Sequence, residues 1–490
     1  MCAFGLHLAF PRTGWWWLSP FALAGLIASW CSLTPRSAAL VGYASGLVFF
    51  AFGFTWFGET AGALLGPAAP ILDIGGAAIE APAFAFAAVI ASFAARRCDV
   101  RSVPLVAAAA YTLAEYLRSS GTWGCPLEQI GLALIDSPLR PLAAFAGVYG
   151  ITFAVALPAA ALGWWLLDSR DPRRGITAAA AWLAVIVCAS LAWSFWPARH
   201  FAPPARRVAA VQGGIAQTLK MSRTGFAVAI DRYTAMTRAL RAAHPSLVLW
   251  PETVITTDLN NPAPAARALG AKFAELAHEI DATLYVGSLA RIGGQRLANA
   301  LYIYDPHVPG LAQYAGARAI YGKEQLVPMA EYIPGPDWVR TLPYADQVGA
   351  YTPAINTVET IDGATPLICW ESLFGDIAHA RLRDNPSLLL IATDDAWFGT
   401  TEFPYEHAMA ASLRAVETGR WVLRAGATGI SGIVAPDGDW TVRTTLGGPA
   451  TVVGDVGAPA PGPYAALGPL PVAVVLAFII LIPLVAGKRS

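Results

Sequence analysis

The sequence predicts a polytopic α-helical membrane region that carries an α/β domain inserted before the last transmembrane helix. Three observations predict this fold class. Hydrophobic residues make up 56% of the 490 residues and charged residues only 13%, about half the charged fraction of an ordinary globular protein. Residues 1–196 form a series of long apolar segments. Residues 197–463 instead alternate short apolar runs with helix-length stretches, and a final apolar segment lies within residues 464–490.

Most of the apolar segments are long enough to cross a bilayer as helices, because a hydrocarbon core of about 30 Å needs about 20 helical residues. Residues 103–116 are fewer and need flanking residues to span. The opening MCAFGLHLAF predicts half a helix, or a start further upstream. We expect about seven spans before the inserted domain and one after it. The segments are Trp15–Leu33, Ala38–Trp56, Ile71–Phe93, Val103–Tyr116, Pro141–Leu167, Gly175–Phe195 and Leu467–Ala486.

Basic residues predict the orientation. Arginines gather in two loops, and two more basic residues end the chain. Loops rich in Lys and Arg usually face the cytoplasm. Alternate threading then places residues 197–463 outside, which in a Gram-negative cell is the periplasmic face of the inner membrane. The basic residues are Arg96, Arg97, Arg101, Arg170, Arg173, Arg174, Lys488 and Arg489.

Charge and cysteine usage exclude several classes. The formal net charge is zero and no basic run is present, so we expect no nucleic acid partner. The six cysteines show no paired spacing, which argues against a disulfide framework and against a cysteine metal site. We therefore expect neither a metal nor a cofactor. Cys369 is the only cysteine in the last 300 residues, within the stretch LICWES.

Within residues 197–463, short apolar runs predict strands and longer stretches predict helices. Pro264–Ile280 and Tyr405–Glu417 have helix length. The strand-like runs are RVAAVQ, SLVLWPE, TLYVGSL, ALYIYD, TPLICWE and SLLLIATDD.

Chemically versatile side chains follow three of the apolar runs. Glu252 ends one run, Lys323 and Glu331 follow another, and Cys369 with Glu371 follows a third. Ligands of α/β sheets usually bind at the carboxyl ends of the strands. Taken singly, a glutamate after a strand is most often a surface residue, and a lone buried cysteine most often fills a core.

Taken together, Glu252, Lys323 and Cys369 resemble the Glu-Lys-Cys triad of the nitrilase superfamily. The resemblance implies an α-β-β-α sandwich with Cys369 as the nucleophile, Glu252 as the general base and Lys323 as the oxyanion stabiliser. It makes the backbone N–H of Trp370 a second oxyanion donor. Glu331 is then expected to bind Lys323 or hold its loop, and Glu371 to orient the cysteine turn.

The architecture resembles a narrower family, the apolipoprotein N-acyltransferases, over nearly the whole chain. The matching motifs are VQGGIAQTLK, WPE, LVPMAEYIP, CWE, DDAWFG and, among the apolar segments, AEYLRSSGTWGCPLEQIG. The resemblance implies that Cys369 takes an acyl chain from a membrane phospholipid as a thioester. The α-amine of a diacylglyceryl-cysteine at the N-terminus of an apolipoprotein then accepts that chain.

Several positions depart from the pattern of that family. Gln325 stands where His is common, Asp394 where Asn is common, and Leu127 where Trp is common; Met221 and Trp370 also differ. These departures bear on lipid and acceptor recognition and leave the triad intact. Two alternatives therefore stay open: a membrane-tethered amidase or an acyltransferase with another amine or acyl donor, and a transporter or inactive scaffold.

Two further motifs are less decisive. Asp73 and Glu80 lie in the apolar segment Ile71–Phe93, where intramembrane carboxylates usually are functional or face a cavity; its glycines and proline are alternatively compatible with a loop at the membrane surface, and Glu80 receives no role. Trp397 and Phe398 within DDAWFG are compatible with a wall of the site and equally with the core.

Overall fold

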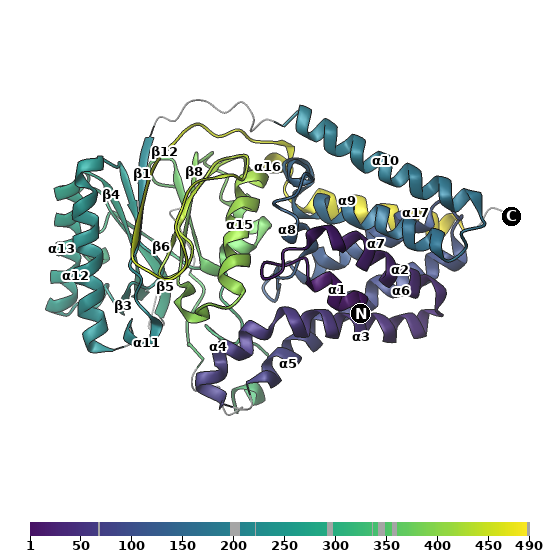
Figure 1. Cartoon of the computed structure of the whole chain (residues 1–490). Helices are drawn as coiled ribbons and strands as arrows, with labels where there is room; N and C mark the ends of the chain where they lie inside the picture. Colours follow the sequence, from purple (N-terminus) through teal and green to yellow (C-terminus); the bar gives the residue numbers. More distant parts are fainter. Residues whose placement is uncertain are drawn as a thin grey trace. The chain divides into compact units, whose positions relative to one another are not determined.

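The computed structural model describes residues 1–66, 69–196, 206–220, 222–291, 297–335, 337–341, 348–354 and 360–487. It divides into two compact units (Figure 1). Residues 1–197 and 461–490 form the helical unit, and residues 198–460 form the α/β unit. Met221, Lys488 and Arg489 lie outside the described residues.

The helical unit contains helices that pack side by side along their lengths. Helix α3 packs against α6, α7 against both α6 and α9, α2 against α9, and α17 against α7. The helices are α1 (Cys2–His7), α2 (Ser19–Ser32), α3 (Pro35–Gly53), α4 (Thr55–Leu65), α5 (Pro70–Glu80), α6 (Pro82–Arg97), α7 (Val103–Arg118), α8 (Ile130–Ala133), α9 (Ala143–Leu166), α10 (Pro172–Ser194), α16 (Pro463–Leu467) and α17 (Leu470–Ala486).

Among the residues that the structure describes, four helical stretches are long and apolar enough to cross a membrane: Pro35–Gly53, Pro70–Arg97, Arg140–Leu166 and Pro172–Ser194. The C-terminal helix Leu470–Ala486 is apolar but has only 17 residues. The expectation of about seven spans before the α/β unit stays a prediction.

The alternative of a loop around Asp73 and Glu80 is wrong, because helix α5 contains both residues. Pro82 then starts α6, where the first turn needs no N–H donor from it. Glu80 is buried, and its Oε2 lies 3.5 Å from Nη1 of Arg118 on α7. Arg118 also donates to the carbonyls of Cys125 and Glu128, so it closes the loop that follows α7.

The α/β unit contains two sheets. The larger has strand order β12-β1-β2-β4-β5-β6, with β3 also paired to β4. Strands β1, β2, β3 and β4 are parallel, while β5, β6 and β12 are antiparallel to their neighbours. Its strands are β1 (Arg206–Gln212), β2 (Leu247–Leu249), β3 (Ile255–Asp258), β4 (Thr283–Arg291), β5 (Leu297–Tyr304), β6 (Ala319–Gly322) and β12 (Ala450–Val456).

The smaller sheet has the order β11-β10-β9-β8-β7, with β7, β8 and β9 parallel. Its strands are β7 (Ala364–Ile368), β8 (Leu388–Thr393), β9 (Trp421–Gly426), β10 (Gly432–Val434) and β11 (Trp440–Arg443). The parallel strands are buried on both faces and therefore read as continuous apolar runs such as SLLLIAT, without polar alternation.

Three apolar layers hold these sheets together. Residues of both sheets, such as Leu249 and Leu390, share one core between them. The outer face of the larger sheet packs against α12 (Arg223–Ala239) and α13 (Pro264–Ile280). The outer face of the smaller sheet packs against α14 (Gly375–Ala380) and α15 (Phe403–Thr418). Figure 1 shows α12 and α13 on one side and α15 on the other, so the unit is an α-β-β-α sandwich.

Candidate active site

Each sequence-predicted site residue follows a strand of the sandwich. Glu252 comes three residues after β2, and Lys323 directly follows β6. Cys369 directly follows β7 and opens a 3-10 turn, Cys369–Leu373. Its φ is +50°, a left-handed conformation that non-glycine residues rarely adopt and that persists only where the surroundings enforce it.

Glu252, Lys323 and Glu331 meet in one buried cluster. Lys323 Nζ donates to Glu331 Oε1 at 2.9 Å and to Glu252 Oε1 at 3.2 Å. Asn299 on β5 also donates to Glu252 Oε1. Glu331 Oε2 accepts the backbone N–H of Val327 at 2.8 Å, so this carboxylate binds both Lys323 and the loop that follows it.

The charges in this cluster define the resting protonation states. Burial alone would lower the pKa of Lys323, but Glu252 and Glu331 outweigh burial and hold that pKa well above its usual value. Lys323 is therefore a cation. Burial, followed by the charge of Glu252, raises the pKa of the Cys369 thiol against the opposing effect of Lys323. The thiol is therefore neutral at rest, so a nucleophilic attack by sulfur needs a base.

Glu371 holds the turn that contains Cys369. Its Oε2 accepts from the backbone N–H of Ile368 at 2.7 Å and from the hydroxyl of Tyr321 at 2.9 Å. Its Oε1 accepts from the backbone N–H of Glu324 at 2.7 Å and of Gln325 at 3.3 Å. One buried carboxylate thus ties the cysteine turn to the segment that follows Lys323. Burial raises the pKa of Glu371 despite these donors.

A second buried ionic cluster lies behind the cysteine turn. Asp395 accepts from Arg424 at 2.7 Å and lies 2.9 Å from Nδ1 of His407. Nε2 of His407 lies 3.1 Å from the carbonyl oxygen of Cys369, which also accepts from Ser372 at 2.7 Å. Burial alone would raise the pKa of Asp395, but Arg424 and His407 outweigh it and hold the pKa at about 2.

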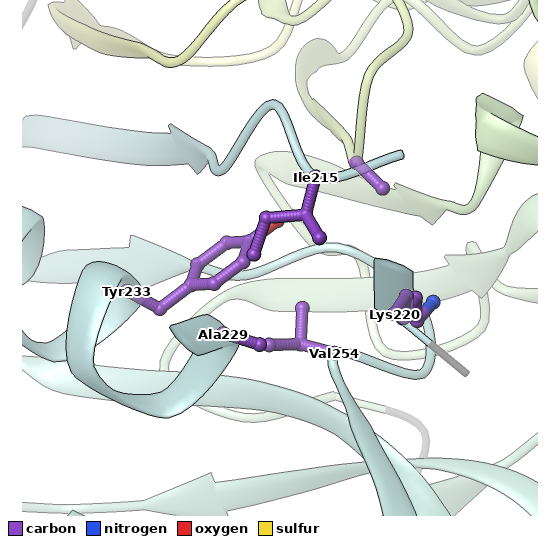
Figure 2. Close-up of a pocket in the computed structure, with 6 residues that line it drawn as sticks. Ile215, Lys220, Ala229, Tyr233 and Val254 are labelled. Atoms are coloured by element: carbon purple, nitrogen blue, oxygen red, sulfur yellow. The ribbon is translucent and has the colours of Figure 1, made fainter. Parts of the chain in front are cut away.

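A third group borders Glu252 on its other side. Glu252 Oε2 accepts the backbone N–H of Asp394 at 2.8 Å, and the Asp394 carboxylate forms an ion pair with Lys220. Lys220 lies beside a small, mostly apolar cavity lined by Ile215, Lys220, Ala229, Tyr233, Val254 and Ala427 (Figure 2).

The remaining predicted residues occupy different environments. Trp370 is buried and its ring packs edge-on to Phe374. Trp397 is half exposed and thus not a core residue, whereas Phe398 packs on Phe403 with ring centroids 4.0 Å apart. Leu127 is buried in the helical unit. Within the described ranges no group of three or more His, Cys, Asp or Glu residues could hold a metal ion.

Sequence reasoning gave no individual role to five residues around the site, although two of them lie in the motifs VQGGIAQTLK and DDAWFG: Asn299, Lys220, Asp395, His407 and Arg424. Two others could have been noticed in the sequence. Asn299 in LANALYIY and Arg424 in WVLRAG are single polar residues in apolar strands. A polar side chain on a fully buried strand must find a buried partner, because leaving it unpaired is costly.

The two-sheet sandwich and its buried Glu, Lys and Cys side chains indicate that the α/β unit is a carbon-nitrogen hydrolase domain. A family model described as carbon-nitrogen hydrolase matches residues 207–459. The predicted fold class is therefore confirmed. A second model, described as apolipoprotein N-acyltransferase N-terminal domain, matches residues 3–161.

Similar proteins extend over both units. An apolipoprotein N-acyltransferase from Methylococcus capsulatus is 30% identical over 459 residues, which cover 88% of this chain and 84% of that protein. One from Ralstonia nicotianae is 31% identical over 470 residues, covering 92% and 85%. The chain belongs to the apolipoprotein N-acyltransferase family. It is accordingly a membrane protein and an acyltransferase.

Among solved structures, an amidase from Nesterenkonia sp. is similar to part of this chain. Its sequence is 18% identical, the TM-score is 0.39, and the match covers 54% of this chain and 94% of the amidase.

Proposed function

We propose that the chain transfers an acyl chain from a membrane phospholipid, through a thioester on Cys369, to the α-amino group of the diacylglyceryl-cysteine that begins an apolipoprotein. The observation that carries the proposal is the buried cluster of Glu252, Lys323 and Glu331, together with a cysteine held at φ +50° directly after a strand. Family membership supplies the acceptor class, because the named relatives are apolipoprotein N-acyltransferases.

In the first step, Cys369 Sγ attacks the ester carbonyl of the phospholipid while Glu252 takes the thiol proton. The raised pKa of the thiol makes this base necessary. Lys323 and the backbone N–H of Trp370 then stabilise the oxyanion. When the C–O bond breaks, protonated Glu252 returns the proton to the leaving oxygen, so lysophospholipid departs and a thioester remains on Cys369.

In the second step, the acceptor amine attacks the thioester carbonyl and the oxyanion forms at the same position. Glu252 accepts a proton from the amine, the C–S bond breaks, and the proton passes to the Cys369 sulfur. The products are an amide and the free thiol. Covalent catalysis thus divides one difficult amide-forming step into two easier ones.

We further propose that the protein resides in the bacterial inner membrane with residues 197–463 on the periplasmic side. The proposal rests on the arginines of residues 96–101 and 170–174, which favour the cytoplasm for both loops. Both proposed substrates carry lipid chains, which is consistent with an α/β unit attached to membrane helices.

Mass spectrometry of lipoprotein N-termini tests the proposed function in cells. A strain depleted of the protein should accumulate diacylated N-termini with a free α-amine. Re-expression of the wild type should restore the amide-linked third chain, and Cys369→Ala should not. The proposal fails if re-expressed wild type leaves the N-termini diacylated. If the purified protein releases free fatty acid equally fast with and without an amine acceptor, the amidase alternative is correct.

A further inference from the structure

Lys220 is a buried lysine outside the proposed triad, at the end of the short helix α11 (Gln217–Lys220). Only 4% of Lys220 is exposed. Its Nζ forms an ion pair with Asp394 and lies 3.1 Å from Oγ1 of Thr253. A buried ammonium group is stable only where partners replace its water, so this lysine binds two segments firmly.

Both of these segments, around Thr253 and around Asp394, lie next to Glu252 and help to position it. Thr253 is the next residue in the chain and has a φ of +45°, a left-handed conformation that persists only where the surroundings enforce it. Asp394 donates its backbone N–H to Glu252 Oε2 at 2.8 Å. Lys220 therefore holds the residue after Glu252 and, through Asp394, one of the two carboxylate oxygens of Glu252. Lys323 and Asn299 hold the other oxygen.

The pair also balances charge beside Glu252. Asp394 is a second buried carboxylate, and like charges raise each other's pKa. Burial raises the pKa of Asp394, and Lys220 opposes that effect. The ionisable groups that face this region from the other packed elements are Lys323, Glu331, Cys369, Asp395, Tyr351 and, on α12, Tyr233.

We propose that Lys220 and Asp394 are positioning residues for Glu252: the ion pair fixes the orientation of the Glu252 carboxylate and cancels the charge that Asp394 would otherwise place beside it. The inference rests on the proposed role of Glu252 as the base. Neither residue touches the reacting atoms, and both act through the Glu252 carboxylate.

The test measures the rate of Cys369 acylation as a function of pH in detergent with phospholipid, by intact-mass spectrometry of the full chain. Lys220→Met leaves the charge of Asp394 uncompensated. The acidic limb of the pH–rate profile should therefore move to higher pH, and the rate at neutral pH should fall roughly 10- to 100-fold. Asp394→Asn keeps its backbone N–H but leaves Lys220 uncompensated, so the acidic limb should move to lower pH. The double variant removes both charges, and the acidic limb of its pH–rate profile should lie close to that of wild type.

Lys272→Met is the matched control, because Lys272 is a partly exposed lysine that lies 3.8 Å from the exposed Asp231. It should acylate like wild type. The inference is overturned if Lys220→Met has an unchanged limb and rate. It is also overturned if both single variants lose rate equally at every pH and the double variant shows no recovery, which is the pattern of a merely structural pair. Failure of the proposed function looks different: wild type then forms no adduct, or Glu252→Gln forms it at the normal rate.

Discussion

At the scale of single residues, Glu371 decides the geometry of the cysteine turn. Its carboxylate accepts hydrogen bonds from two segments far apart in the chain, around Ile368 and around Glu324. Cys369 needs that support, because a φ of +50° is unfavourable for a residue with a side chain. Glu371, itself a residue of this turn, therefore supports the conformation of Cys369 through these contacts.

Glu371→Gln should weaken this support, because an amide has only one oxygen and its NH2 group would face hydrogen-bond donors. We expect a loss of about 1.5–3 kcal/mol in the free energy of unfolding, the range for hydrogen bonds to a charged group, and at least tenfold slower acylation of Cys369. Thermal unfolding and intact mass check both effects. Glu279→Gln is the control, since Glu279 pairs with Arg238 at the surface and should contribute little. Equal effects of the two substitutions would contradict this role.

Asp395 makes stability depend on pH. Its pKa is about 2 in the folded protein and about 3.9 when unfolded, so its stabilisation is fully present above about pH 4 and is lost as pH falls through 2. Asp395→Asn leaves Arg424 without its buried partner and should cost about 3–5 kcal/mol. Thermal unfolding between pH 3 and pH 7 should show a constant difference from wild type down to about pH 4 and a smaller one below. A difference that grows below pH 4 would refute the charged state of Asp395.

The sequence indicated only part of the site, and the reason is physical. Residues that closely follow apolar strands stand out in a sequence, which is how Glu252, Lys323 and Cys369 could be selected. Asn299 and Lys220 come from elements that meet Glu252 only after the sheet has formed, so their spacing along the chain carries little information about their contacts.

At the scale of secondary-structure elements, the long apolar runs are the features from which the sequence predicts the structure. Pro264–Ile280 forms helix α13 with the expected bounds, and TLYVGSL and ALYIYD form the paired strands β4 and β5. For the segment around Glu80, the glycines and the proline make a loop one of two alternatives. Burial and the ion pair with Arg118 stabilise a helix there, and neither is visible in the local sequence.

A glycine on β4 sets how closely the segment that bears Glu252 can approach the sheet. A Cβ atom at Gly287 would lie 1.9 Å from the carbonyl oxygen of Pro251, the residue before Glu252. Gly287→Ala should therefore displace that segment and slow acylation roughly 100-fold, as expected for a shift of about 1 Å. Gly448→Ala is the control, because a Cβ there meets no atom within 4 Å. Normal acylation by Gly287→Ala would show that this close approach is dispensable.

At the scale of the whole molecule, the two units differ in the kinds of side chain that they expose. The helical unit exposes large apolar side chains such as Ile79 and Leu183, which suits a lipid environment, whereas α12 and α13 expose charged residues such as Asp231 and Lys272. The proposed orientation of the α/β unit across the membrane rests on the basic loops alone.

Cysteine labelling checks that orientation. In a background in which the exposed Cys2 and Cys188 are replaced by Ser, Asp231→Cys in the α/β unit should react with a membrane-impermeant maleimide in cells whose outer membrane has been permeabilised. Arg173→Cys, at the start of α10, should react only after lysis. The opposite pattern would reverse the orientation and remove the α/β unit from the periplasm.

The most direct test of the central claim is the mass of the protein after incubation with phospholipid in detergent. The account predicts that wild type gains the mass of one acyl chain, that neutral hydroxylamine removes it, and that Cys369→Ala, Glu252→Gln and Lys323→Met fail to acquire it while keeping the thermal stability of a folded protein. An adduct on Cys369→Ala, or a wild type that never gains an acyl chain from any phospholipid, would contradict acyl transfer through a Cys369 thioester.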